Sequence, residues 1–232
     1  MRTMPPAFSS ASGSDPELSI LLEDLCARAL ADLGAGGPPD LAVLFVTPDF
    51  GEDHAQAGGI VRERTGARHL LGCSGIGVIG TEAEREGGTS AALLLARLPD
   101  TQLRPFHVIQ DDFTGEGSPD RVLPSGNPTA ALVLADPYTL NPDDLLAAGN
   151  FAWPGRPVLG GLASGARQPG VHALWLNGET HREGAVGFGI VGGVDVRPLV
   201  SQGCRPIGRR FTVTRAGKNR ILITPGCYQF AF

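Results

Sequence analysis

The chain has 232 residues, of which 42% are hydrophobic and 19% are charged, and its formal net charge is −5. A chain of this length can bury roughly 70–75% of its unfolded surface, so one sizeable domain or two small ones are expected. The acidic balance, without a run of Lys or Arg, predicts no nucleic-acid partner. No stretch approaches eighteen apolar residues, so we expect no membrane partner and a cytoplasmic protein.

The cysteines and histidines predict neither a disulfide framework nor a metal site, and we expect no cofactor. The five histidines lack the close spacing typical of metal ligands. The four cysteines have no paired spacing, which favours a reducing compartment. They are Cys26, Cys73, Cys204 and Cys227.

The first elements are read from composition and periodicity. Residues 1–13 are rich in Pro, Ser and Ala and are predicted to be disordered. Ser14 and Glu17 have the spacing of a capping box, and leucines at helical spacing follow as far as Leu33. A continuous apolar run at Leu41–Val46 predicts a strand buried on both faces. A second helix is expected from Asp49 to about Thr65.

The later elements alternate between strands and helices. Two strands, Thr89–Leu98 and Leu103–Ile109, are predicted to form a hairpin around Pro99-Asp100. Asn141-Pro142 predicts the start of a helix that runs to Ala148. The other predicted strands are Ala130–Ala135, Pro157–Leu162, and segments near Val171–Leu176, Gly184–Val191, Val194–Ser201 and Phe211–Arg215.

An internal echo organises the sequence. His69–Gly80 (HLLGCSGIGVIG) is followed about ninety residues later by Pro157–Ala166 (PVLGGLASGA), and both contain glycines and a Ser-Gly pair. We interpret residues of about 40–110 and 130–202 as two pseudo-symmetric units of strand, helix, strand and hairpin. The predicted fold class is α+β (mixed α/β), with mixed sheets covered by helices.

Several strings resemble a known family: HLLGCSGIGVIG, EREGGTSAALLLARLP, PVLGGLASGA and VSQGCRPIGRRFTVTRAGKNRIL. They are similar to the FIST N-terminal domain, named for F-box and intracellular signal transduction proteins. The resemblance runs from about Asp40 to about Leu222. It implies a sensory module that binds small ligands such as amino acids and works beside a signalling partner.

The resemblance also bears on domain organisation. We expect residues 14–222 to form one domain similar to the FIST N-terminal domain. Family members normally continue into a C-terminal FIST domain, whereas here ITPGCYQFAF follows Leu222, so the usual second domain is expected to be missing. Residues 223–232 are predicted to be an atypical tail that adds little to the fold.

Two enzymatic patterns are incomplete. Gly75–Gly80 matches G-x-G-x-x-G, but only the short polar segment Thr81–Glu86 follows, where a dinucleotide site needs a crossover helix. Ser74 lies in half of a nucleophile elbow, in which Ile76 replaces the final Gly. We therefore expect no enzyme, although a hydrolase or transferase that uses Cys73 or Ser74 stays open as an alternative.

The favoured interpretation is binding of a small polar ligand, such as an amino acid or an amino-acid-like metabolite. Successive backbone N–H groups in two equivalent glycine-serine loops can form a nest for a carboxylate or phosphate, and an arginine can pair with an acidic ligand. A protein-interaction or scaffold module without a small ligand is the main alternative. Small residues that only permit close packing would also explain the pattern. The candidate ligand-binding residues are Gly72, Cys73, Ser74, Gly75, Gly160, Gly161, Ser164, Gly165, Gln202 and Arg205.

Overall fold

The computed structural model describes residues 5–81, 83–114, 123–126, 128–166, 168–200, 215–217 and 220–222. The chain forms two compact units, residues 1–198 and 199–232. In the second unit, β13 (Arg215–Gly217) and β14 (Arg220–Leu222) pair as an antiparallel hairpin. All other described elements belong to the first unit. The predicted domain of residues 14–222 extends beyond the C-terminal end of this unit.

Two mixed sheets make up most of the first unit, as predicted. The six-stranded sheet has the order β1 (Ala7–Ser14), β6 (Ser90–Arg97), β2 (Leu41–Val46), β3 (His69–Ser74), β10 (Leu174–Leu176) and β11 (Glu179–His181). The four-stranded sheet has the order β7 (Thr101–Val108), β12 (Ala185–Gly192), β8 (Ala130–Ala135) and β9 (Val158–Leu162). A small hairpin joins β4 (Gly77–Ile79) to β5 (Glu84–Glu86).

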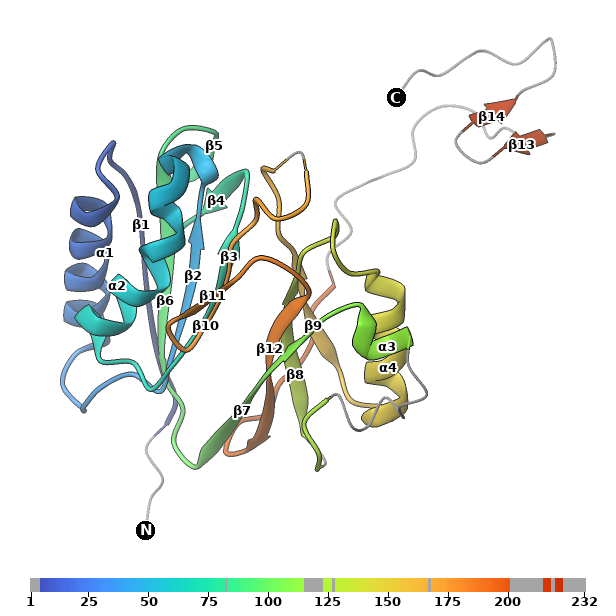
Figure 1. The fold of residues 1–232 in the computed structure, drawn as a ribbon. Coiled ribbons are helices and arrows are strands. Elements are labelled where there is room, and N and C mark those ends of the chain that lie inside the picture. Colours follow the sequence, from blue (N-terminus) through green and yellow to red (C-terminus); the bar gives the residue numbers. More distant parts are fainter. Residues whose placement is uncertain are drawn as a thin grey trace, which may run out of the picture. The chain divides into compact units, whose positions relative to one another are not determined.

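The helices lie on the outer faces of the two sheets (Figure 1). The six-stranded sheet is covered by α1 (Leu18–Leu33) and α2 (Ala57–Thr65), which follows the 3-10 helix η1 (Pro48–Gln56). The four-stranded sheet is covered by α3 (Asp111–Thr114) and α4 (Pro142–Ala152). Three apolar clusters fill the spaces between the resulting layers, so both sheets are largely buried on both faces.

Local sequence explains the longer helices. Leu18, Leu21, Leu22 and Leu25 lie on one buried face of α1, which ends at Gly34 with φ of 73°. The side chain of Asn141 accepts a hydrogen bond from the Asp143 N–H and thereby caps α4, as its sequence predicts.

The predicted N-terminal disorder is wrong for the described part of residues 1–13, because Ala7–Ser14 pairs with β6 along its whole length. The predicted capping box is also wrong. Ser14 ends β1, the N-cap of α1 is Glu17, and Asp15 rather than Ser14 accepts the Glu17 N–H. The strand exists because long-range pairing supplies hydrogen bonds that composition does not reveal.

Two further strand predictions need correction. β6 and β7 are consecutive strands but belong to different sheets, and Asp100, with φ of 56°, turns the chain from one sheet to the other. The expected hairpin is therefore a connection between layers. Residues 193–200 contain no strand, and most of the strand expected at Phe211–Arg215 lies outside the described residues.

Four strands of each sheet share one arrangement. β1-β6-β2-β3 and β7-β12-β8-β9 both contain two antiparallel pairings followed by a parallel one. Each group begins one strand before the corresponding unit that the sequence predicted: β1 precedes the unit of about 40–110, and β7 precedes the unit of about 130–202. The internal duplication itself stays an interpretation, but strands can be compared position by position.

Candidate functional site

The structure brings the two predicted glycine-serine loops together. The backbone N–H of Ser164 donates to the carbonyl of Ser74 at 3.1 Å, and the N–H of Ile76 donates to Ser164 Oγ at 3.0 Å. The segments are ninety residues apart in the sequence, yet they hold each other in place. They lie next to one another, where β3 and β9 end.

Most of the polar groups that could form a nest already have partners in the protein. Ser74 is fully buried, its backbone N–H donates to the Ala173 carbonyl at 2.9 Å, and its hydroxyl accepts the Ala173 N–H at 3.1 Å. The Gly75 N–H donates to the Val46 carbonyl at 3.0 Å. A ligand carboxylate would have to displace these bonds, so this geometry favours a structural role, and ligand binding at these loops stays a prediction.

The other candidate glycines lie on β3, on β9 and in the loop after β9. Gly72 and Gly160 pair with Leu44 and Val133, whose carbonyl oxygens leave no room for a β-carbon on either glycine. Gly161 lies exposed on β9, while Gly165 packs against Pro48. Gln202 and Arg205 lie outside the described residues.

Cys73 lies on the face of β3 that packs between the sheets and is only 3% exposed. Burial raises the pKa of its thiol to about 12. The thiolate needed for nucleophilic attack is therefore scarce at neutral pH. Burial also raises the pKa of the Cys26 thiol, to about 11.

We expect Cys73 to remain unmodified when the folded protein is treated with iodoacetamide at pH 8. Mass mapping of alkylated peptides measures this directly, and the same protein in guanidinium is the control in which the thiol must react. Rapid alkylation of Cys73 in the folded protein would contradict this account and would favour the covalent-enzyme alternative.

The structure contains a buried aspartate-histidine pair that the sequence analysis did not predict. Asp136 and His172 are almost fully buried, and His172 Nδ1 lies 2.9 Å from an Asp136 carboxylate oxygen. His172 Nε2 accepts the Ala166 N–H at 3.1 Å, so the ring proton sits on Nδ1 and is donated to Asp136. The only hint in the sequence was Asp136 at the start of a turn, where its side chain accepts the Tyr138 N–H.

This pair is not poised for acid-base catalysis. A histidine that activates a serine needs a free ring nitrogen directed at the hydroxyl. In His172 that nitrogen is occupied by a backbone amide of the loop that follows Ser164. Within the described part of the chain, no histidine is hydrogen-bonded to Ser74 or Ser164. The pair instead fixes this loop to the end of β8.

Two other histidines stack where the edges of the two sheets meet. The rings of His107 on β7 and His181 on β11 have centroids 3.9 Å apart and line a cavity of about 530 Å³ together with Arg182 and Glu183. Burial, and secondarily the neighbouring His107, lower the pKa of His181. In the described ranges, no group of three or more His, Cys, Asp or Glu side chains is placed to hold a metal ion.

An apolar cavity with a volume of about 700 Å³ lies on the inner face of the six-stranded sheet. Its floor is a grid of side chains from three adjacent strands, set by the pairing register. The rows of the grid are Phe8, Ala96 and Leu41, then Ser10, Leu94 and Val43, and then Ser12, Ala92 and Phe45. All of these except Ser12 line the cavity.

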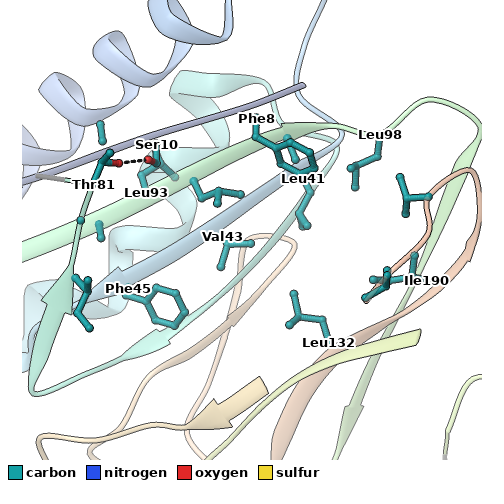
Figure 2. Close-up of a pocket in the computed structure, with 18 of the residues that line it drawn as sticks. Phe8, Ser10, Leu41, Val43, Phe45, Thr81, Leu93, Leu98, Leu132 and Ile190 are labelled. Carbon is teal, nitrogen blue, oxygen red and sulfur yellow. Dashed lines mark hydrogen bonds between the residues drawn. The ribbon is translucent and has the colours of Figure 1, made fainter. Parts of the chain in front are cut away.

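The opposite wall comes from the other sheet and the chain that follows it. Figure 2 shows Leu132 and Ile190 facing the side of the cavity where Val43 and Phe45 lie. Residues 194–197 complete this wall, and Arg197 pairs there with Asp195 at 2.7 Å. At the other end, the hydroxyls of Ser10 and Thr81 are hydrogen-bonded at 2.7 Å (Figure 2).

The cavity exists because the central strand of its floor carries small side chains. Ala92 and Ala96 flank Leu94 on the inner face of β6. At the corresponding strand of the other sheet, β12, the large side chains of Phe188 and Val186 fill the core. Sequence reasoning missed this cavity, since the strands that form it are far apart in the chain and β1 was not expected.

Known proteins share sequence with this chain. The FIST N domain family matches residues 40–224. An uncharacterized protein of Mycobacterium tuberculosis (strain H37Rv) is 31% identical over 205 residues, which cover 87% of this chain and 52% of that protein. An uncharacterized protein of Mycobacterium bovis is 32% identical over 194 residues, or 82% of this chain and 48% of that protein.

The chain thus spans about half the length of the curated relatives that it matches. Of the helices that the structure describes, none combines the length and apolar character needed to cross a membrane. The family match covers most of the chain and includes both glycine-serine loops and most of the cavity floor. The chain therefore belongs to the FIST N domain family.

Proposed function

We propose that this chain is a sensory domain of signal transduction and that it binds a small ligand in the cavity between β1-β6-β2 and the wall formed by Leu132, Ile190 and residues 194–197. The observation that supports this function is the cavity itself. Its volume of about 700 Å³ falls within the range of about 300–1,000 Å³ typical of small-molecule sites. It lies between the two sheets and is open to solvent, because Phe8 and Ile79 in its lining are exposed.

The lining indicates the ligand class. The floor and most of the walls are aliphatic or aromatic, so burial of apolar ligand surface would supply most of the binding free energy. The hydroxyls of Ser10 and Thr81 provide one polar end, where a ligand carbonyl or hydroxyl can join their hydrogen bond. Asp195 and Arg197 already neutralise each other. A mainly apolar molecule with one polar group fits better than a free amino acid.

A ligand panel tests the proposal. Purified protein is screened by thermal shift against medium-chain alcohols, ketones and carboxylic acids, with amino acids and nucleotides as the competing classes. A ligand at one hundred times its dissociation constant stabilises a one-site protein by about 2.7 kcal/mol, which is readily measured. We expect saturable stabilisation by apolar compounds that carry one polar group.

Filling the cavity locates the site. Ala92→Leu adds a branched side chain to the floor, and we expect it to weaken binding of the best compound at least about tenfold, or about 1.4 kcal/mol. Ala147→Leu, the same change at an exposed position on α4, is the matched control and should bind normally. Unchanged affinity in Ala92→Leu would contradict the site, and a panel without any saturable binder would contradict the ligand class.

One observation favours the interaction-module alternative. Phe8, Ile79 and Leu94 line the cavity and are 60%, 78% and 38% exposed, so a partner protein could cover the same surface. In that case Phe8→Ser would weaken partner capture while no compound of the panel binds.

A further inference from the structure

β9 forms the outer edge of the four-stranded sheet, and among the described residues this edge has no further strand, so it is called the open edge. β9 pairs with β8 on one side, and no described strand pairs with its other side. Gly160, Gly161 and Leu162 are exposed, and Leu162 is 51% exposed. Residues 157–163 (PVLGGLA) carry no charge, although proteins usually protect such edges with charged side chains.

The corresponding edge of the six-stranded sheet is covered. β3 pairs in parallel with β2, as β9 pairs in parallel with β8. On its other side, β3 pairs with β10 in antiparallel orientation. Trp175 of β10 lies opposite Gly72 and fills the space between Gly72 and Gly58 of α2. A glycine on the edge strand thus makes room for a large side chain of the added strand.

β9 has the same glycine on its edge, but no described side chain lies against it as Trp175 lies against Gly72. Gly160 pairs with Val133 as Gly72 pairs with Leu44. Beside Gly160, an apolar cavity of about 300 Å³ lies between β9 and α4, where Trp175 lies between β3 and α2 in the other sheet. Leu145, Leu146, Val158 and Leu162 are among the residues that line it.

We propose that β9 pairs with β9 of a second copy of this chain and that the two four-stranded sheets continue across this contact. A two-fold axis brings a strand against its own copy in antiparallel orientation, the orientation that β10 has on β3. Residues 157–163 carry no charged side chain, so pairing two copies of β9 brings no like charges together.

Self-complementarity fixes the register. With Gly161 on the two-fold axis, Leu162 lies opposite the partner's Gly160 and on the same face of the joined sheet. Each half-exposed Leu162 then enters the α4–β9 cavity of the other copy, as Trp175 covers Gly72 within one chain. The neighbouring register that would place Val158 there is disfavoured, because Val158 already packs against the core.

A cross-linking experiment tests the register. Directly opposed residues in antiparallel strands have Cα atoms about 4.5–5.5 Å apart, within the range that a disulfide spans. A β-carbon on Gly161 would have no neighbour within 4 Å, so Gly161→Cys should not disturb the chain. In a background with Cys204→Ser and Cys227→Ser, we expect most Gly161→Cys protein to form a disulfide-linked dimer under mild oxidation. The matched control, Ala147→Cys on the exposed face of α4, should stay monomeric on non-reducing gels.

Sedimentation velocity of the unmodified chain tests the contact itself. We expect a concentration-dependent dimer, and at least a tenfold weaker dimer in Leu162→Lys, which brings a charge into the apolar cavity. Ile20→Lys, a similar change at a position of α1 that is 56% exposed, should dimerise normally. A monomer at every concentration up to about 100 μM, or an absent Gly161→Cys cross-link, would overturn the proposal. Neither outcome bears on ligand binding at the other cavity.

Discussion

Replacing Trp175 with alanine is expected to lower the free energy of unfolding by about 3–5 kcal/mol. The Trp175 side chain is fully buried and packs against Gly58 of α2 and Gly72 of β3. Its indole N–H donates to the Ala55 carbonyl at 3.1 Å. The substitution removes this contact between sheet and helix, and the two glycines cannot fill the space that it leaves.

Urea denaturation followed by circular dichroism measures the loss. Trp175→Phe keeps most of the apolar volume but loses the hydrogen bond, so we expect about half of the effect of alanine or less. If Trp175→Ala unfolds at nearly the wild-type urea concentration, β10 does not hold the edge of β3 as described, and the comparison with the open edge of β9 loses its basis.

Replacing Asp136 with alanine is expected to cost about 3 kcal/mol or more. Its carboxylate accepts hydrogen bonds from His172 Nδ1, the Tyr138 N–H and the Thr139 hydroxyl. Alanine leaves these donors without their acceptor in a buried setting. The loop after Ser164, which His172 holds through Ala166, should loosen as a result.

A double-mutant cycle separates this network from a general loss of packing. Asp136→Ala and His172→Ala should each destabilise the protein, and the double variant should lose clearly less than the sum of the two. Chemical denaturation of the four proteins gives the coupling free energy. Strict additivity would show that the pair does not act as a unit.

Local patterns predicted much of the fold. The apolar run of β2, the leucine spacing of α1 and the Asn141 cap of α4 are properties of neighbouring residues, so they could be read without the structure. β1 could not be predicted in this way. Ser9, Ala11 and Gly13 of β1 are buried but small, which gives the strand little apolar signal, and its order comes from pairing with β6.

The candidate sites show the same limit. The sequence indicated two related glycine-serine loops, and the structure brings them together, but their partners are Val46 at the end of β2 and Ala173 just before β10. Because hydrogen bonds between distant segments decide whether a loop can accept a ligand, no local pattern separates a nest from a packing contact. The apolar cavity likewise requires the strands of Phe8 and Ala92 to be neighbours.

The central claim is that a ligand lies on the inner face of β1-β6-β2. NMR titration of isotopically labelled protein with the strongest compound of the panel tests it most directly. We expect the largest chemical-shift changes at Val43, Ala92 and Leu94, with saturation at the same concentration as the thermal stabilisation. Changes centred on the loops of Ser74 and Ser164, with Val43, Ala92 and Leu94 unaffected, would contradict the claim and favour the site expected from the sequence.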